Sequence, residues 1–417
     1  MAGNGGDLTE VYVTFCAKNN IKTNPYIVEV LQNTPVTESF TLKLPGNNRL
    51  NPVQRLDDKD ALALSKCLQN NASVAGLDLR YNNITDEGAA HLSDLLQEGN
   101  SALRSLDLTF NDIETDGAEI LSKSLQSNSS LLSLRLSGNK IGNRGATYLA
   151  AVLQVNATLQ DLHLDDCDLA TQSVIALAIM LKNNRTLRSI DISRPLLFSL
   201  QEEWVVHWAE MLEVNGGLVE LHLGKTGLTN TGMERLAEGL RLNHSLRYLD
   251  LRCNRVTCDG VRPLAETLKH NGTLEVIDLS SNRMEDEGAV YLSEAVASAG
   301  CGLKQLSVCS NNIRTEGLLA LGQALMVNTT MSHIYIWGNP LEQAVCKAFA
   351  DLMSCGRLAP EQTDVSAYEV DGHMFLAQVT HSLTRRTPGT DAELGHTNHP
   401  NTNPASTPPQ NMEDEQM

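Results

Sequence analysis

Apolar and polar positions along the chain repeat with a period of 28 or 29 residues. The pattern Leu-x-Leu-x-x-Asn occurs at Leu77–Asn82, Leu106–Asn111 and Leu134–Asn139, and it returns later at Leu249–Asn254. Strict alternation of apolar and polar residues predicts a short strand whose leucines face a core. A period of this length predicts a solenoid, in which each unit buries its apolar face against its neighbours.

The second half of each unit has the spacing of an amphipathic helix. After Ile84, the small and apolar residues Gly88, Ala89, Leu92 and Leu96 fall on one helical face. Threonines occupy the positions where we expect helix N-caps, at Thr85, Thr115, Thr229, Thr257 and Thr315. Acidic residues follow most of them and suit the positive end of the helix dipole.

These periods divide the chain into four parts. Residues 36–355 hold about eleven repeats, in which an asparagine ladder is expected to satisfy the turn after each strand. Residues 1–35 are predicted to cap the open end of the core. Residues 356–384 form a C-terminal flank, and residues 385–417 are predicted to be disordered because they lack apolar periodicity.

The rhythm changes in repeats five to seven, where Cys167, Pro195 and Thr226 replace the ladder asparagine. An insertion near residues 195–208 follows and contains Trp204 and Trp208. Two interpretations stay open for these tryptophans. They pack onto the helix layer as part of a local insertion, or they form an exposed hot spot for a partner.

Asn-x-Ser/Thr triplets recur just after each predicted helix, for example at Asn128, Asn156 and Asn184. Their constant place in the repeat indicates an architectural role rather than glycosylation. Asparagine tolerates the left-handed conformation that ends many helices, so we expect that conformation there.

The overall charge limits the kinds of partner. The chain carries a net charge of −18 with a pI near 5.0, which argues against direct binding to nucleic acid or to an anionic membrane. Two interpretations of the charge stay open: an acidic concave face attracts a basic protein partner, or the charge only keeps a long solenoid soluble. Residues 1–7 do not resemble a signal peptide, and no apolar run is long enough for a transmembrane helix. Nine scattered cysteines suit free thiols, so we expect an intracellular, cytoplasmic protein.

Motifs for chemistry are weak throughout. Gly224-Lys225 lacks the earlier glycine of a phosphate-binding loop. The repeat spacing predicts that His163 and His222 lie two strands apart, roughly 10 Å, which is too far for them to share a metal. The sequence therefore predicts no enzyme activity, no metal, no cofactor and no small-molecule substrate.

Binding is instead expected on the concave face, where polar and aromatic positions project between the core leucines. The candidate partner-binding residues are Tyr81, Phe110, His163, Asp165, Asp166, Asp191, Arg194, Trp204, Trp208, Tyr248, Arg252, Tyr335 and Trp337.

The repeats from about Phe40 to Cys355 resemble the ribonuclease-inhibitor-like subclass of leucine-rich repeats. The resemblance implies an α/β solenoid shaped as a curved horseshoe segment, with parallel strands on the concave face and helices on the convex face. Such proteins include binding scaffolds, ribonuclease inhibitors and Ran GTPase-activating proteins. A scaffold accounts for the whole chain, and GTPase activation or ribonuclease inhibition are the alternatives.

The flank from Asp364 to Phe375, together with the overall layout, is similar to one vertebrate family of leucine-rich-repeat proteins. That resemblance implies an intracellular protein, partly nuclear or nucleolar, linked to the proliferation and differentiation of stem and germ cells. It supplies no catalytic residues.

Overall fold

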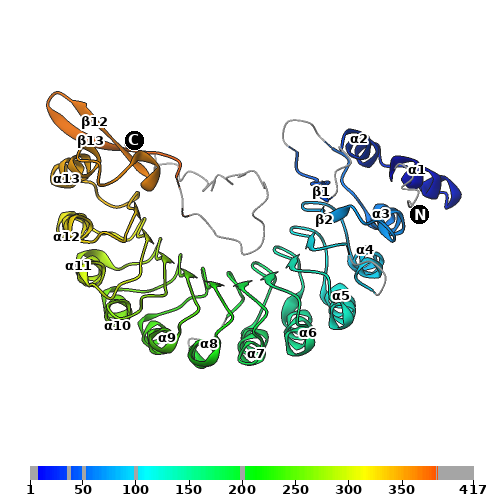
Figure 1. Cartoon of the computed structure of the whole chain (residues 1–417), viewed down its shortest axis with the longest axis horizontal. Coiled ribbons are helices and arrows are strands. Elements are labelled where there is room, and N and C mark those ends of the chain that lie inside the picture. Colours follow the sequence, from blue (N-terminus) through cyan, green and yellow to red (C-terminus); the bar gives the residue numbers. More distant parts are fainter. Residues whose placement is uncertain are drawn as a thin grey trace, which may run out of the picture. The chain divides into compact units, whose positions relative to one another are not determined.

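The computed structural model describes residues 8–34, 39–48, 53–97, 102–197, 202–381 and 383 (Figure 1). The predicted tail, residues 385–417, and residues 198–201 of the insertion lie outside this part. Within the described segments, no helix is both long enough and apolar enough to cross a bilayer.

One parallel sheet of eleven strands runs through the repeats, with the strands in chain order. The strands are β1 (Phe40–Lys43), β2 (Val74–Asp78), β3 (Ser105–Asp107), β4 (Ser133–Arg135), β5 (Asp161–His163), β6 (Ser189–Asp191), β7 (Glu220–His222), β8 (Tyr248–Asp250), β9 (Val276–Asp278), β10 (Gln305–Ser307) and β11 (His333–Tyr335). The register aligns Leu77 with Leu106 and Leu106 with Leu134, so equivalent residues of successive repeats stand in rows. The predicted α/β solenoid is confirmed.

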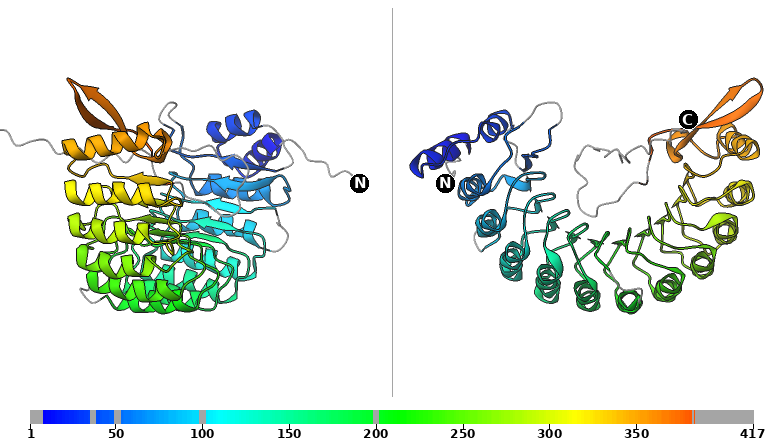
Figure 2. Two further views of the ribbon diagram at one scale, coloured as in Figure 1. Left: turned by 60° about the vertical axis from the view of Figure 1, so that its left-hand side comes forward. Right: turned by 180° about the vertical axis from the view of Figure 1, so that it is seen from behind.

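A helix follows each strand and lies on the outer side of the curved array, while the strands line its inner side (Figures 1 and 2). These helices are α3 (Asp58–Leu68), α4 (Asp86–Ser93), α5 (Thr115–Ser127), α6 (Gly142–Val155), α7 (Thr171–Leu181), α8 (Glu203–Val214), α9 (Asn230–Leu242), α10 (Cys258–Leu268), α11 (Glu285–Ala297), α12 (Thr315–Val327) and α13 (Gln343–Ser354). A short 3₁₀ helix, Asp94–Leu96, extends α4. The apolar residues of both layers form one continuous buried core.

The predicted asparagine ladder holds the turns after β2–β4 and β8–β11. Asn139 illustrates it: its side-chain Nδ2 donates to the carbonyl of Leu136 at 2.7 Å and to that of Leu108, in the preceding repeat, at 2.9 Å. Its Oδ1 accepts the backbone N–H of Ile113 at 3.0 Å. One buried side chain thus satisfies backbone groups of two repeats.

Side chains of the preceding repeat cap most of the helix N-termini named here, in place of the local threonines that the sequence predicts. The side-chain Oδ1 of Asp286, near the start of α11, accepts the backbone N–H groups of Arg314 at 3.0 Å and Gly317 at 2.7 Å, at the start of α12. Equivalent contacts come from Asp58, Asp86, Asn143, Glu202 and Asn230. Of the five threonines expected at N-caps, Thr85, Thr229 and Thr257 occupy that position, while Thr115 and Thr315 are already the first residues of their helices. Only the Thr85 side chain accepts a capping bond, from the backbone N–H of Glu87. The cap therefore comes from the neighbouring repeat.

The asparagines after the helices form a second ladder, in extended rather than left-handed conformation. Asn128 has φ −70° and ψ 130°, so the predicted left-handed helix end is wrong. Its Nδ2 donates to the carbonyl of Leu96 at 2.9 Å, and its Oδ1 accepts from Ser130 and Leu131. At this position the asparagine amide group joins two repeats, and the backbone does not need a left-handed conformation.

Both ends of the array are covered. Helices α1 (Leu8–Lys18) and α2 (Pro25–Asn33) lie over the first repeat, where the buried Tyr12 hydroxyl donates to Asp60 at 3.4 Å. At the other end, the 3₁₀ helix Pro360–Gln362 leads into a hairpin of β12 (Val365–Val370) and β13 (His373–Gln378), which packs on α13. Asp364 accepts the backbone N–H groups of Ile336 and Trp337, so its carboxylate covers the edge after β11.

The second ladder can be tested at a pair of adjacent asparagines. Asn184 is buried and bonds to Leu153, Thr186 and Leu187, whereas Asn183 is exposed. We expect Asn184→Ala to lower the free energy of unfolding by roughly 2 kcal/mol or more, because buried backbone groups lose their partners. We expect Asn183→Ala to change it by less than about 0.5 kcal/mol. Urea unfolding followed by circular dichroism measures both, and equal effects would contradict the ladder.

Candidate binding face

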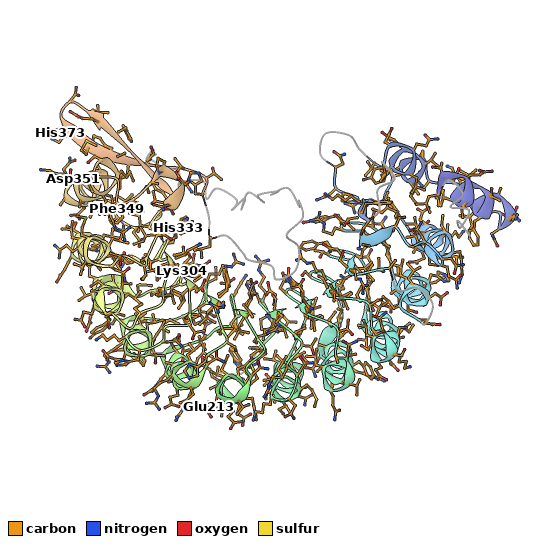
Figure 3. The ribbon with its side chains drawn as sticks, viewed as in Figure 1. Glu213, Lys304, His333, Phe349, Asp351 and His373 are labelled. Carbon is orange, nitrogen blue, oxygen red and sulfur yellow. The ribbon has the colours of Figure 1, made fainter. Side chains whose placement is uncertain are left out.

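Each strand presents polar side chains on the inner side of the array, between and beside its core leucines (Figure 3). In β5 the alternation places Asp161 and His163 on this side, and Asp165 follows just after the strand. Because the register is in line from strand to strand, these positions form columns along the sheet. The inner side is therefore a continuous surface of aligned side chains.

The structure divides the predicted binding residues into three groups. Exposed or partly exposed on the inner side are Tyr81, Phe110, Asp165, Asp166, Arg194, Arg252 and Trp337. Buried in the same surface are His163, Asp191, Tyr248 and Tyr335. Buried in the core beneath are Trp204 and Trp208.

Trp204 and Trp208 do not form an exposed hot spot. Both lie on α8 and are 3% and 0% exposed, and the indole Nε1 of Trp208 donates to the carbonyl of Val174 at 3.2 Å. They fill the helix layer, as the alternative interpretation of the insertion held. The insertion that precedes the two tryptophans shifts the repeat spacing, so counting along the repeat does not assign them to the helix layer.

Tyr81 and Phe110 form an aromatic stack at the ends of adjacent strands. Their ring centroids are 4.9 Å apart with an interplanar angle of 17°, and Phe110 is 41% exposed. Both residues have positive φ, 60° and 52°, which turns the side chains outward. The Phe110 ring lies over Gly138, where an added Cβ would come within 2.3 Å of it. A side chain at Gly138 would displace the ring.

Other aromatic positions are less accessible than the sequence suggested. Tyr248 is 6% exposed and Tyr335 is 2% exposed, so neither offers a large contact surface. Trp337 is half-buried and lines an open pocket of about 540 Å³ together with Pro340, Leu341 and Leu376. Of these three aromatics, Trp337 has the most accessible ring.

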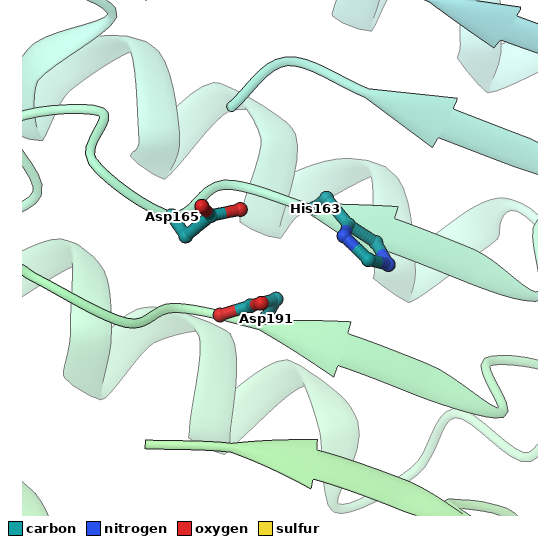
Figure 4. A group of neighbouring side chains, drawn as sticks. All are labelled: His163, Asp165 and Asp191. Carbon is teal, nitrogen blue, oxygen red and sulfur yellow. The ribbon is translucent and has the colours of Figure 1, made fainter. Parts of the chain in front are cut away.

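A histidine and two carboxylates converge at the middle of the array (Figure 4). Side-chain atoms of His163, Asp165 and Asp191 that can bind a metal all lie within 4.8 Å of one another. His163 is paired with Asp191 across β5 and β6, and its Nε2 contacts Asp161 Oδ1 at 2.9 Å. The repeat register in the sequence already aligns His163 with Asp191, so their proximity could be predicted from the spacing of the repeats.

Asp161 is ionised by its neighbours. Burial alone would raise the pKa of its carboxyl, but the charge and hydrogen bond of His163 and the charge of Arg135 outweigh burial and hold that pKa well below its ordinary value. Ser133 donates a further bond at 2.6 Å. The carboxylate is thus a fixed hydrogen-bond acceptor at neutral pH.

A second buried histidine, His222, lies two strands further. It is fully buried, with its Nδ1 3.5 Å from Asp250 and its Nε2 3.7 Å from Glu220. The rings of His163 and His222 lean together to a centroid distance of 6.4 Å, less than the roughly 10 Å expected from strand spacing alone. Burial and the charge of Asp250 raise the pKa of the next carboxyl in the column, Asp278.

The repeats match the family model described as Leucine Rich repeat at residues 70–93, 99–122, 127–150, 155–178, 242–265 and 270–293. With the parallel sheet and outer helices, this defines the class: the chain is a leucine-rich repeat protein.

Among known proteins, the chain is 54% identical to human leucine-rich repeat-containing protein 34 over 384 residues, covering 91% of this chain and 82% of that protein. It is 46% identical to the mouse protein of the same name, covering 90% and 91%, and 51% identical to the rat protein, covering 91% and 92%. The chain belongs to the family of leucine-rich repeat-containing protein 34.

Among solved structures, an internalin from Listeria monocytogenes aligns over 87% of this chain and 95% of its own, with 16% identity and a TM-score of 0.43. The mouse RP105/MD-1 complex aligns over 66% of this chain and 44% of its own, with 18% identity and a TM-score of 0.39.

The lowered pKa of Asp161 predicts a pH effect. A carboxyl whose pKa is lower in the folded than in the unfolded chain stabilises the fold above its ordinary pKa, and this contribution disappears as the pH falls. We expect the wild type to lose about 1–3 kcal/mol more unfolding free energy than Asp161→Asn between about pH 5 and pH 2. Urea unfolding across this range measures the difference, and parallel curves would contradict the assignment.

Proposed function

We propose that this protein is a non-enzymatic interaction scaffold whose inner face binds a protein partner with basic and apolar features. As a leucine-rich repeat protein homologous to leucine-rich repeat-containing protein 34, the chain is consistent with a protein-interaction scaffold. The observation that carries the finer proposal is the juxtaposition, on one aligned surface, of acidic columns and an exposed aromatic stack.

Acidic side chains predominate at the inner positions. The acidic residues are Asp78, Asp107, Asp161, Asp165, Asp166, Asp191, Glu220, Asp250 and Asp278. The basic residues between them are Arg80, Arg135, Arg194, Lys225 and Arg252. Several of these pair with one another, as Arg80 does with Asp78 at 2.8 Å. The excess of carboxylates gives the face a field that attracts a basic partner and speeds its association.

Apolar contacts are available toward both ends of the face. Tyr81 and Phe110 stack beside β2 and β3, and Trp337 lines the pocket after β11. Aromatic side chains at accessible positions are frequent anchors of protein interfaces. The order of features fits a partner that presents a basic segment flanked by apolar side chains.

The cellular role is proposed from family resemblance alone. We propose that the protein acts inside the cell, in the cytoplasm and in the nucleus or nucleolus, in stem-cell or germ-cell proliferation and differentiation. Nucleic acid, membrane and small molecules are not expected as direct ligands, in keeping with the net charge of −18.

The face can be tested with a double substitution, Phe110→Ala with Asp166→Lys. Both residues are exposed, with Phe110 at 41% and the Asp166 side chain at 47%, so we expect the fold to be retained. Removing an aromatic anchor and reversing one charge is expected to weaken a partner held on this face by about tenfold or more. Quantitative mass spectrometry after affinity capture from cells that express the protein measures the loss.

The matched control is Glu213→Lys on the outer surface of α8, where the side chain points away from the array (Figure 3). It reverses the same charge on the opposite face. Proteins that the wild type and Glu213→Lys both retain, and that the inner-face variant loses, would support the proposal. Equal retention by all three chains would overturn it.

A further inference from the structure

The cluster of His163, Asp165 and Asp191 has the composition of a metal site. It offers one imidazole nitrogen and two carboxylate oxygens, all within 4.8 Å of one another, on the inner side of β5 and β6. Imidazole with carboxylates suits divalent ions of the first transition row, whose ligand bonds are about 2.0–2.2 Å long.

The hydrogen bond to His163 fixes which nitrogen faces the carboxylates. A carboxylate can only accept a hydrogen bond, so Nε2 of His163 is the donor in its 2.9 Å contact with Asp161. Nδ1 is then the nitrogen turned toward Asp165 and Asp191 (Figure 4). Nδ1 and one oxygen of each carboxylate therefore offer three ligand atoms to one ion, which would take the place of any proton on Nδ1.

The carboxylates are oriented from outside the cluster as well. Ser137 donates its hydroxyl to Asp165 Oδ1, and the backbone N–H of Ser193 donates to Asp191 Oδ1 at 3.0 Å. Metal ligands in proteins are commonly held by such outer hydrogen bonds, and a histidine ligand commonly donates its other nitrogen to a carboxylate, as His163 does to Asp161. Of the neighbouring guanidinium groups, Arg135 pairs with Asp161 and Arg194 with Asp166. Arg252 pairs with Asp250, and its charge also interacts with Asp191.

We propose that His163 Nδ1, Asp165 and Asp191 bind one divalent transition-metal ion, with Asp161 as the positioning residue. The site does not depend on the proposed partner binding. It places a positive charge at the middle of an acidic face, and an ion there would order the inner ends of β5 and β6.

The test is a titration of the purified, reduced and chelator-treated full chain with Mn²⁺, followed by electron paramagnetic resonance. Mn²⁺ favours carboxylate ligands over the free thiols of this chain. We expect one bound Mn²⁺ per chain, and pulsed measurements should show coupling to a single imidazole nitrogen. Asp161→Asn should weaken binding by about 10- to 100-fold, and His163→Ala by at least as much, with loss of the nitrogen coupling.

The matched control is His207→Ala, which removes the Nδ1 contact with Glu210 at 3.8 Å on the outer helix α8. It should bind Mn²⁺ like the wild type. If His163→Ala fails to fold by circular dichroism, Asp165→Asn, at a partly exposed position, serves in its place. Absence of saturable binding, or wild-type affinity and coupling in the His163 or Asp165 variant, would overturn the site. Since no partner is present, this result is independent of the capture experiment.

Discussion

The structure depends on how the chain satisfies the hydrogen-bonding groups of its backbone in the buried turn that follows each strand. The turn leaves carbonyl and N–H groups in a region that water does not reach, and each unmet group would cost about 1–3 kcal/mol. In most repeats a side chain with two donors and an acceptor satisfies these groups across two neighbouring repeats at a time. Asn139 does so with bonds to Leu108, Leu136 and Ile113. The in-line register, and with it the inner face, follows from that fixed spacing.

Local patterns were enough to predict the strands and helices of the repeats and the asparagine ladder, but they did not predict the capping contacts between repeats. Alternation in Leu77–Leu79 predicts a strand because the signal lies within the strand itself. The carboxylate that caps α12 belongs to Asp286, in the preceding repeat, so no local capping motif reveals it. The same holds for Asn128, whose amide bonds to Leu96 and whose backbone is extended. The terminal hairpin of β12 and β13 also gave no periodic signal.

The inner face was predictable in position but not in exposure. Counting along the repeat places Tyr335 and Phe110 on that face, yet one is 2% exposed and the other 41%. Exposure depends on the side chains of the two flanking strands and on the residue after the strand, where a positive φ lifts Phe110 outward. Burial of Trp208 depends likewise on how the insertion before α8 sets the helix, which spacing within one repeat does not reveal.

Pro195 stands where the other repeats have a side chain that can donate a hydrogen bond, since even Cys167 and Thr226 donate through sulfur and hydroxyl. A solenoid is held together only by contacts between neighbours, so one weak junction limits how far order is transmitted along it. Residues 1–385 form one compact unit, and Pro195 lies at the point in it where this side-chain bond between neighbouring repeats is missing. A mechanical load along the array would concentrate its strain at that junction.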